Sequence, residues 1–467
     1  MWKFLPMLLC SSCLLAAERD ASWSQFRGPD SSGIVESANL PLEFGPEKNV
    51  IWKTAVPLGK SSPVFAGDRI FLTGHEGEKL LTLCFDRRSG KELWRQSVTR
   101  ERTERRNKLN DPAAPTPVTD GRHVVSFFAD FGLVTYTVGG KELWRKPMGP
   151  FVSLQGVSAS PLVIGGRLFI VCDQTRDSFI EALDTATGKL LWRKARQPAP
   201  AGGYSTPNRF VRKGEVQLVV PGPFGIVAYQ PSTGETLWSI HGLPGQPKSS
   251  AVVVGDMIYF AEKGGGENNI TVLPYEAART AHDKDGDGKL TAEEMPVAIL
   301  KNLFKHLDTD GDGSLDPKEW AAVKDFFDAK SMAVAIRPEG SGDLPASAVK
   351  WRFERNIPDV PTPLVYRGIV YLVQSGGIVS ALDAATGVLR KQGRLTQALG
   401  DYYASPVGAD GKVYMVSQAG MVSTLTAEGE WEVLATSDMG EDCFATPALV
   451  EGRMYLRTAT ALYAFGK

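Results

Sequence analysis

The sequence is poor in several features that would assign it to a specialised class of protein. Its 467 residues include only 5 cysteines, and the charged residues nearly cancel, leaving a formal net charge of -1. Cys10 and Cys13 lie in the apolar N-terminal stretch, while Cys84, Cys172 and Cys443 are widely spaced. This spacing excludes a disulfide framework and a thiolate metal site, so we expect the last three to be buried in the core. A near-neutral chain does not attract polyanions, so nucleic acid is not an expected partner.

The chain also lacks an N-terminal apolar run long enough to span a membrane. Residues 4–17 are too few, because a transmembrane helix needs about 20. Lys3 precedes this apolar run, and Ala16 and Ala17 end it before a polar stretch. This order predicts that residues 1–17 are a secretory signal peptide and that the chain is periplasmic or secreted, with no membrane span. The alternative, a buried N-terminal helix, lacks an amphipathic period.

A repeated residue pair divides the chain into units. Ser or Thr followed by Pro recurs at intervals of about 40 to 55 residues, and Ser250-Ala251 takes one further place. The first residues of the other pairs are Ser62, Thr116, Ser160, Thr206, Thr362, Ser405 and Thr446. One interval, from Ser250 to Thr362, is 112 residues long and contains an acidic stretch. Such self-similarity predicts a repeat architecture.

Each unit reads as an antiparallel sheet. Two apolar strands joined by a Gly- or Asp-bearing turn follow the opening pair, as in "PLVIGGRLFIVC", and a segment such as "ALDTATGKLLW" (182–192) ends the unit. Units of this length with short strands predict an all-β, eight-bladed β-propeller. The last opening leaves only enough chain for three strands, so we expect strand 49–56 to complete the last blade and close the ring.

The closing segments resemble those of a known family. Ala-x-Asp-x-x-Thr-Gly-x-x-x-Trp is similar to the tryptophan-docking motif of the PQQ-like (quinoprotein-type) β-propellers, and "WSQFRGP" near the N-terminus also resembles them. The resemblance implies the propeller fold. It leaves function open, because the family includes quinone-dependent alcohol dehydrogenases and an outer-membrane assembly lipoprotein without a cofactor. The dehydrogenases usually hold PQQ against a disulfide of adjacent cysteines, a pair that residues 18–467 do not contain.

The tryptophans recur at corresponding places in the units. They are Trp52, Trp94, Trp144, Trp192 and Trp238, and in the copy at 381–391 Lys391 replaces the tryptophan. A cofactor-stacking set is one interpretation. The regular placement favours packing between neighbouring blades instead.

Two stretches in the long interval have the spacing of EF-hand calcium loops. The predicted ligands of the first loop are Asp283, Asp285, Asp287, the Lys289 carbonyl, Thr291 and Glu294. Those of the second are Asp308, Asp310, Asp312, the Ser314 carbonyl, Asp316 and Glu319. Hard oxygen ligands at these positions surround one Ca²⁺ with about seven contacts. The sequence therefore predicts two calcium ions; the alternative is an acidic, solvated loop.

The EF-hand pair forms an α-helical insertion at 274–331, within the fifth blade. It divides the propeller into 18–273 and 332–467, so that the extra residues occupy a loop between strands. Residues 295–307 are too few for two helices and a linker, so we expect one helix shared by both loops. Capping boxes at Thr291–Glu294 and Asp316–Glu319 mark helix starts. A structural calcium clip is the first interpretation, and a switch exposing Phe326 and Phe327 is the second.

One other segment could carry chemistry. The loop 100–112 contains four arginines, which could receive an anion at the propeller rim, but interspersed Glu101 and Glu104 favour a solvated loop.

Three functional hypotheses remain from the sequence. The first is an exported binding or assembly scaffold, with an unknown protein or small-molecule ligand at the rim or funnel. The second, which rests on the family resemblance alone, is a PQQ-dependent oxidoreductase. The third is a calcium-regulated interaction protein.

Overall fold

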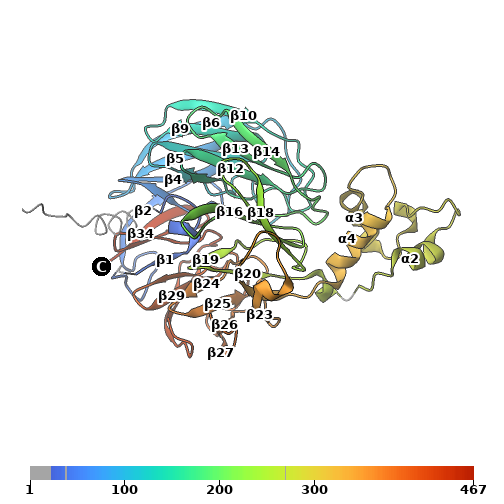
Figure 1. Ribbon diagram of the computed structural model, residues 1–467. Coiled ribbons are helices and arrows are strands. Elements are labelled where there is room, and N and C mark those ends of the chain that lie inside the picture. Colours follow the sequence, from blue (N-terminus) through green and yellow to red (C-terminus); the bar gives the residue numbers. More distant parts are fainter. Residues whose placement is uncertain (1–22, 37–38, 269) are drawn as a thin grey trace, which may run out of the picture.

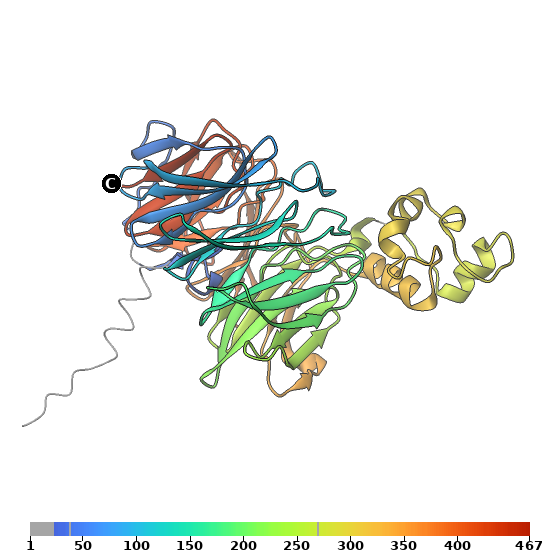
Figure 2. The same ribbon diagram turned by 90° about the horizontal axis from the view of Figure 1, so that it is seen from above.

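The computed structural model describes residues 23–36, 39–268 and 270–467, and the predicted signal peptide lies outside these ranges. Eight mainly antiparallel sheets are arranged around a central axis, and a helical module projects from one side (Figures 1 and 2). The chain is an eight-bladed β-propeller with an α-helical insertion in its fifth blade, as predicted. No helix in the described ranges is long and apolar enough to cross a membrane.

Each blade contains four consecutive strands, except where the insertion and the ring closure intervene. The first two blades comprise β3 (Val64–Ala66), β4 (Arg69–Glu76), β5 (Lys79–Asp86) and β6 (Glu92–Thr99), then β7 (Val118–Thr119), β8 (His123–Phe128), β9 (Gly132–Thr137) and β10 (Glu142–Pro147). The third and fourth comprise β11 (Leu162–Ile164), β12 (Arg167–Cys172), β13 (Phe179–Asp184) and β14 (Leu190–Ala195), then β15 (Asn208–Arg212), β16 (Glu215–Gly222), β17 (Gly225–Tyr229) and β18 (Thr236–His241).

The second half of the ring repeats this pattern. The fifth and sixth blades comprise β19 (Val252–Val254), β20 (Met257–Glu262), β21 (Met332–Ile336) and β23 (Val349–Phe353), then β24 (Leu364–Tyr366), β25 (Ile369–Gln374), β26 (Ile378–Asp383) and β27 (Leu389–Arg394). The last two comprise β28 (Val407–Ala409), β29 (Lys412–Val416), β30 (Met421–Thr426) and β31 (Val433–Asp438), then β32 (Ala448–Val450), β33 (Arg453–Arg457), β34 (Ala461–Phe465) and β2 (Val50–Ala55). Short strands β22 (Gly342–Asp343) and β1 (Ile34–Val35) pair in parallel with β18 and β28.

The hydrophobic core lies between neighbouring blades. Second strands such as β12 are buried almost throughout, whereas the outer strand β10 alternates between half-buried and exposed residues. One apolar cluster joins Phe169 and Ile180 of the third blade to Leu218 and Val220 of the fourth. The inner strands are continuously apolar because a neighbouring blade covers each of their faces.

The N-terminal strand closes the ring. β2 pairs antiparallel with β34, with Trp52 opposite Ala464, so the last blade combines three C-terminal strands with one N-terminal strand. This pairing gives β34 a second hydrogen-bonded neighbour and joins the two ends of the chain.

Tryptophans dock five of the eight blades onto the next blade. The indole N–H of Trp52, Trp94, Trp144 and Trp192 donates to a main-chain carbonyl of the following blade, at 2.9 to 3.1 Å. Trp351 does the same from the fifth blade, at 2.9 Å. The packing interpretation is thus confirmed for these four predicted tryptophans, and the sequence analysis missed Trp351.

Two of the remaining three junctions show other contacts. Trp238 is buried, but its indole donates to Gln217 within its own blade at 2.8 Å. At the sixth blade, the Lys391 ammonium donates to the Trp431 carbonyl at 2.6 Å and lies 4.7 Å from the centre of the Trp431 ring. A cation–π contact and a hydrogen bond therefore join the sixth and seventh blades where the tryptophan is absent.

The segment around "WSQFRGP" lies across the inner strands of several blades. The Trp23 and Ser24 carbonyls accept hydrogen bonds from the first and second blades, and the Gly33 carbonyl accepts one from the seventh. Arg27 is fully buried and donates to the carbonyls of Pro363 and Pro406 at 3.0 Å. Its burial lowers the pKa of the guanidinium to about 9. This segment ties blades on opposite sides of the ring to one another.

The inserted module lies between β20 and β21. It contains α2 (Tyr275–His282), η3 (Ala292–Glu294), α3 (Ala298–Leu307) and α4 (Pro317–Asp328). As predicted, one α-helix, α3, lies between the two loops, and both capping boxes are present. Leu290 and Leu315 are buried, and the Leu315 N–H donates to the Leu290 carbonyl at 2.8 Å, which pairs the loops.

Candidate functional site

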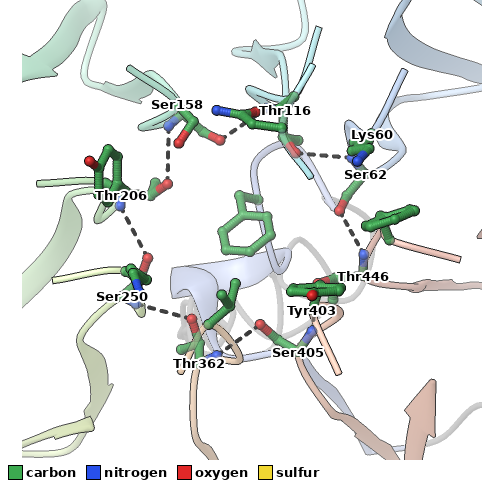
Figure 3. Close-up of a pocket in the computed structure, with 18 of the residues that line it drawn as sticks. Lys60, Ser62, Thr116, Ser158, Thr206, Ser250, Thr362, Tyr403, Ser405 and Thr446 are labelled. Carbon is green, nitrogen blue, oxygen red and sulfur yellow. Dashed lines mark hydrogen bonds between the residues drawn. The ribbon is translucent and has the colours of Figure 1, made fainter. Parts of the chain in front are cut away.

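The residues that open each unit form a closed ring around the propeller axis. In each one the backbone N–H donates to the side-chain hydroxyl of the next, and the last donates to the first (Figure 3). The members are Ser62, Thr116, Ser160, Thr206, Ser250, Thr362, Ser405 and Thr446, with donor–acceptor distances of 3.0 to 3.2 Å. The pair that revealed the repeat in the sequence therefore makes one continuous hydrogen-bonded circle.

This hydroxyl ring borders an axial pocket of about 320 Å³. Most of the remaining lining comes from loops that connect one blade to the next. Those loops contribute amides, aromatic rings and charged groups: Asn107, Asn110, Gln155, Tyr204, Lys248, Asp359, Tyr403 and Phe444. Phe26 of the N-terminal segment and Lys60 also line the pocket. Sequence analysis expected a ligand at the rim or funnel but identified none of these loop residues, because they do not recur between units.

One wall of the axial pocket combines an aromatic pair with a cation. The rings of Tyr403 and Phe444 stack with centroids 5.4 Å apart and an interplanar angle of 18°. The Lys60 ammonium lies 3.6 Å from the centre of the Phe444 ring and donates to the Leu109 carbonyl. Burial lowers the pKa of Lys60. An ammonium partly removed from water in this way is a strong hydrogen-bond donor for an incoming acceptor.

A second charged group lies elsewhere in the axial pocket. Lys248 pairs with Asp359 at 2.7 Å. The pocket therefore has one compensated ion pair and one ammonium, Lys60, held by an aromatic ring and a carbonyl.

In both EF-hand loops the carboxylates converge. Oxygens of Asp283, Asp285 and Asp287 lie within 4.8 Å of one another, and those of Asp308, Asp310 and Asp312 do the same. Carboxylates at this separation repel one another unless a divalent cation lies between them. Gly288 and Gly313, at φ of 84° and 89°, make the sharp turns that bring the carboxylates together. The donor set and its geometry suit Ca²⁺ in each loop.

The glutamates that end the two loops turn back into them. The Glu294 carboxylate accepts hydrogen bonds from the backbone of Lys284 at 2.8 Å and of Thr291 at 2.9 Å. The Glu319 carboxylate accepts one from the Asp316 backbone at 3.1 Å. Hydrogen bonds from Thr291 and Lys284 lower the pKa of Glu294 to about 2, which keeps it ionised.

The remaining predicted ligands organise the loops in the structure. The backbone N–H groups of Lys289 and Ser314 donate to Asp287 and Asp312, each at 2.8 Å. Asp316 accepts from the Glu319 N–H at 2.7 Å as a helix cap. All twelve predicted residues therefore lie on the two loops, and their role as ligands stays a prediction.

The prediction that loop 100–112 is solvated holds for Arg105, which is exposed, but is wrong for Arg100, Arg102 and Arg106, which are partly buried. Asp130, between β8 and β9, is fully buried and forms ion pairs with Arg106 and, at 3.2 Å, with Arg100. Arg102 contacts Glu104, which is only 8% exposed. The sequence could not reveal this, because Asp130 lies outside the loop and approaches it only in the folded blade.

The described cysteines are buried and free, as expected. Cys84, Cys172 and Cys443 have no disulfide partner in the described ranges. Burial raises the pKa of Cys84 and Cys443 to about 12, so both thiols are protonated and inert.

Comparisons with known proteins agree with this architecture. The family model of the outer membrane protein assembly factor BamB matches residues 79–265 and 343–465, and an EF-hand model matches residues 300–324. No curated protein is significantly similar in sequence to this chain.

Solved structures share the fold at low sequence identity. BamB from Moraxella catarrhalis is 11% identical, with a TM-score of 0.52, over 90% of this chain and 99% of that chain. A europium-containing methanol dehydrogenase is 9% identical, with a TM-score of 0.61, over 98% and 100%. The quinohemoprotein alcohol dehydrogenase from Comamonas testosteroni is 12% identical, with a TM-score of 0.56, over 98% and 83%. At these identities the similarity establishes the fold alone.

Proposed function

The chain belongs to the PQQ-like propeller family of the outer membrane protein assembly factor BamB, and on this premise we propose that it is an exported, calcium-binding scaffold that receives a ligand in its axial pocket. The ligand is a small molecule or a segment of a partner protein. The observation that carries the proposal is the axial pocket, which several blades build together. Export rests on the N-terminal sequence, which is typical of a signal peptide.

The chemistry of the axial pocket supports binding. Ligand pockets are concave, have volumes of about 300 to 1,000 Å³, and combine apolar or aromatic walls with a few fixed polar groups. At about 320 Å³, this pocket has the size for a small molecule or a few residues of a chain. Tyr403 and Phe444 offer an aromatic surface, and Lys60, Asn107 and Gln155 offer polar groups. The hydroxyl ring keeps this lining in a fixed geometry.

Calcium binding is the second part of the proposal. We propose two ions, one in each loop, held by the twelve residues predicted from the sequence. The convergent carboxylates of both loops support this assignment. Extracellular calcium modules bind with dissociation constants of about 10⁻⁴ to 10⁻³ M, which suits an exported protein that meets calcium outside the cell.

A PQQ-dependent oxidoreductase is the alternative function. It is favoured by one feature of the axial pocket, where an aromatic pair and the Lys60 ammonium lie together. A planar, anionic molecule such as PQQ fits this chemistry, and Lys60 would hold a carboxylate of it. Bound PQQ would supply the redox chemistry. Calorimetric titration of PQQ into the calcium-loaded protein decides between the scaffold and the oxidoreductase. One PQQ molecule bound per chain supports the oxidoreductase, and absence of binding contradicts it.

A thermal-shift screen with paired variants tests the binding proposal. Monosaccharides, dicarboxylates, short peptides and PQQ are added to the calcium-loaded protein and to two tryptophan variants. Ser158→Trp fills the axial pocket, and Ser232→Trp places the same side chain in an exposed turn between β17 and β18. A ligand at about 100 times its Kd stabilises by about 2.7 kcal/mol. The proposal expects a rise in Tm for the wild type and Ser232→Trp only. A rise shared by Ser158→Trp, or none with any probe, contradicts it.

A further inference from the structure

The EF-hand module is fixed to the propeller through its second calcium loop. Arg176, in the turn between β12 and β13, donates to the main-chain carbonyl of Asp308 at 2.8 Å from Nη2 and at 3.3 Å from Nε. The same guanidinium lies 3.7 Å from the Asp308 carboxylate. Asp308 occupies the first ligand position of the second loop, so a propeller residue directly contacts this calcium site.

A buried histidine makes the second polar connection. His306, only 4% exposed, lies between Thr175 and Arg105, with 3.0 Å from Nδ1 to the Thr175 hydroxyl and 3.0 Å from Nε2 to the Arg105 guanidinium. Because arginine has no acceptor, Nε2 must accept from Arg105, and Nδ1 therefore donates to Thr175. By contrast, the described hydrogen bonds of the first loop stay within the module, as in Lys284 with Glu293 and Glu294.

Apolar residues complete this attachment. Leu303, Leu307, Val323 and Phe326 of α3 and α4, together with Leu154, Pro200, Ala201 and Phe224 of the propeller loops, line an apolar cavity of only about 30 Å³. Apolar residues of α3 and α4 thus face apolar residues of the protein's own propeller across this small cavity.

The loops that contact the module also form walls of the axial pocket. Arg105 contacts His306, and the neighbouring Asn107 and Leu109 line the pocket. The next inter-blade loop places Leu154 against the module and Gln155 in the pocket. The module and the pocket lie on the same face because of the topology. Strands alternate in direction, so the loops after the second and the fourth strand of each blade emerge on the same face of the propeller.

Hydrogen bonds join these residues into one wall. The Asn107 N–H and the Asn110 side chain both donate to the Gln155 carbonyl, at 3.1 and 3.0 Å. The Leu109 carbonyl accepts from Lys60, which also contacts Phe444. Hydrogen bonds, together with the short stretches of chain between them, therefore connect Asp308 to the aromatic pair.

From these contacts we propose that Ca²⁺ in the second EF-hand loop orders the wall of the axial pocket, and that Ca²⁺ in the first loop does not. The inference rests on the proposed calcium and ligand sites and deepens them, because it assigns the regulation of the pocket to one loop. Without the ion, the carboxylates of Asp308, Asp310 and Asp312 repel one another and loosen the loop. The ion draws them together and fixes the backbone that Arg176 and, through His306, Arg105 contact.

Amide hydrogen exchange, measured with calcium and with a chelator, tests the proposal without any pocket ligand. The samples are the wild-type chain and two matched variants, Glu319→Gln in the second loop and Glu294→Gln in the first, at calcium concentrations that saturate the remaining site. Coupling between sites typically changes an equilibrium about 5- to 150-fold. We expect calcium to slow exchange by such a factor in residues 103–110 and 173–178 of the wild type and Glu294→Gln, but not of Glu319→Gln.

Two results would overturn this inference. Calcium protection confined to residues 273–331 would mean that the module binds the ion without affecting the pocket wall. Equal protection of residues 103–110 in both variants would mean that the second loop has no special role. Matching exchange of all three proteins in chelator ensures that a folding defect is not mistaken for either result.

A further variant, Arg105→Gln, separates the two polar connections. It should keep calcium protection in residues 173–178 and lose it in 103–110, and retention in 103–110 counts against the route through His306. Absence of any pocket ligand in the thermal-shift screen would contradict the proposed function but leave these exchange results unchanged.

Discussion

Thr362→Val tests how much the hydroxyl ring stabilises the propeller. The Thr362 hydroxyl accepts a hydrogen bond from the Ser250 N–H at 3.0 Å, and the two residues are 2% and 3% exposed. Valine has nearly the same shape but no acceptor, so the Ser250 N–H loses its partner in a site that water hardly reaches. Leaving a buried donor unsatisfied costs about 1 to 3 kcal/mol. At roughly 2 °C per kcal/mol for a large domain, Tm should fall by about 2 to 6 °C.

Differential scanning calorimetry of Thr362→Val and Thr362→Ser measures this effect. Serine keeps the hydroxyl and removes only a methyl group, so it controls for packing at the same position. We expect Thr362→Ser to remain closer to the wild type than Thr362→Val. Equal Tm values for the two variants would refute the argument, because the hydrogen bond would then contribute nothing beyond the shape of the side chain.

Three other outcomes follow from the structure. Gly188→Ala places a Cβ 2.6 Å from the Trp144 ring at a φ of 71°, whereas Gly165→Ala has open space at a φ of 56°. In urea unfolding, Gly165→Ala should lose about 1 to 2 kcal/mol of stability through left-handed backbone strain, and Gly188→Ala should lose clearly more. Equal losses for the two variants would contradict the docking of blades through Trp144. Burial raises the pKa of Glu262 well above its ordinary 4.5, so the folded state binds the proton more tightly, and stability from this group falls as pH rises above about 4.5. Glu262→Gln keeps the acceptor for the Gln246 N–H. In urea unfolding, its stability relative to the wild type should therefore increase from pH 5 to pH 8. If the stability difference between the two proteins is the same at both pH values, the raised pKa of Glu262 is contradicted. Calorimetry of the chelator-treated protein should show two calcium ions per chain, and one ion or none would contradict the assignment of two loops.

Features that depend on local spacing could be predicted from the sequence. The eight openings, the strand pairs after them and the long interval at residues 250–362 gave the number of blades and the place of the insertion. Loop ligands at fixed positions predicted the two EF-hand loops, and the short stretch 295–307 between them predicted the single shared helix. These features are local because hairpins and EF-hand loops close over a few residues, so their chemistry must be present in consecutive sequence.

The pocket and its neighbours depend on contacts that the spacing does not encode. In the hydroxyl ring, Thr446 and Ser62 form a hydrogen bond although they are 384 residues apart in the sequence. Asp308 of the insertion accepts a hydrogen bond from Arg176, which belongs to another blade. Loop 100–112 looked solvated because its buried partner, Asp130, belongs to a different turn. The repeat in the sequence determined that blades exist and how many there are. Only the tertiary structure decided which non-repeating loop residues face the axis, because that depends on closing the ring and bringing the ends of all eight blades to one place.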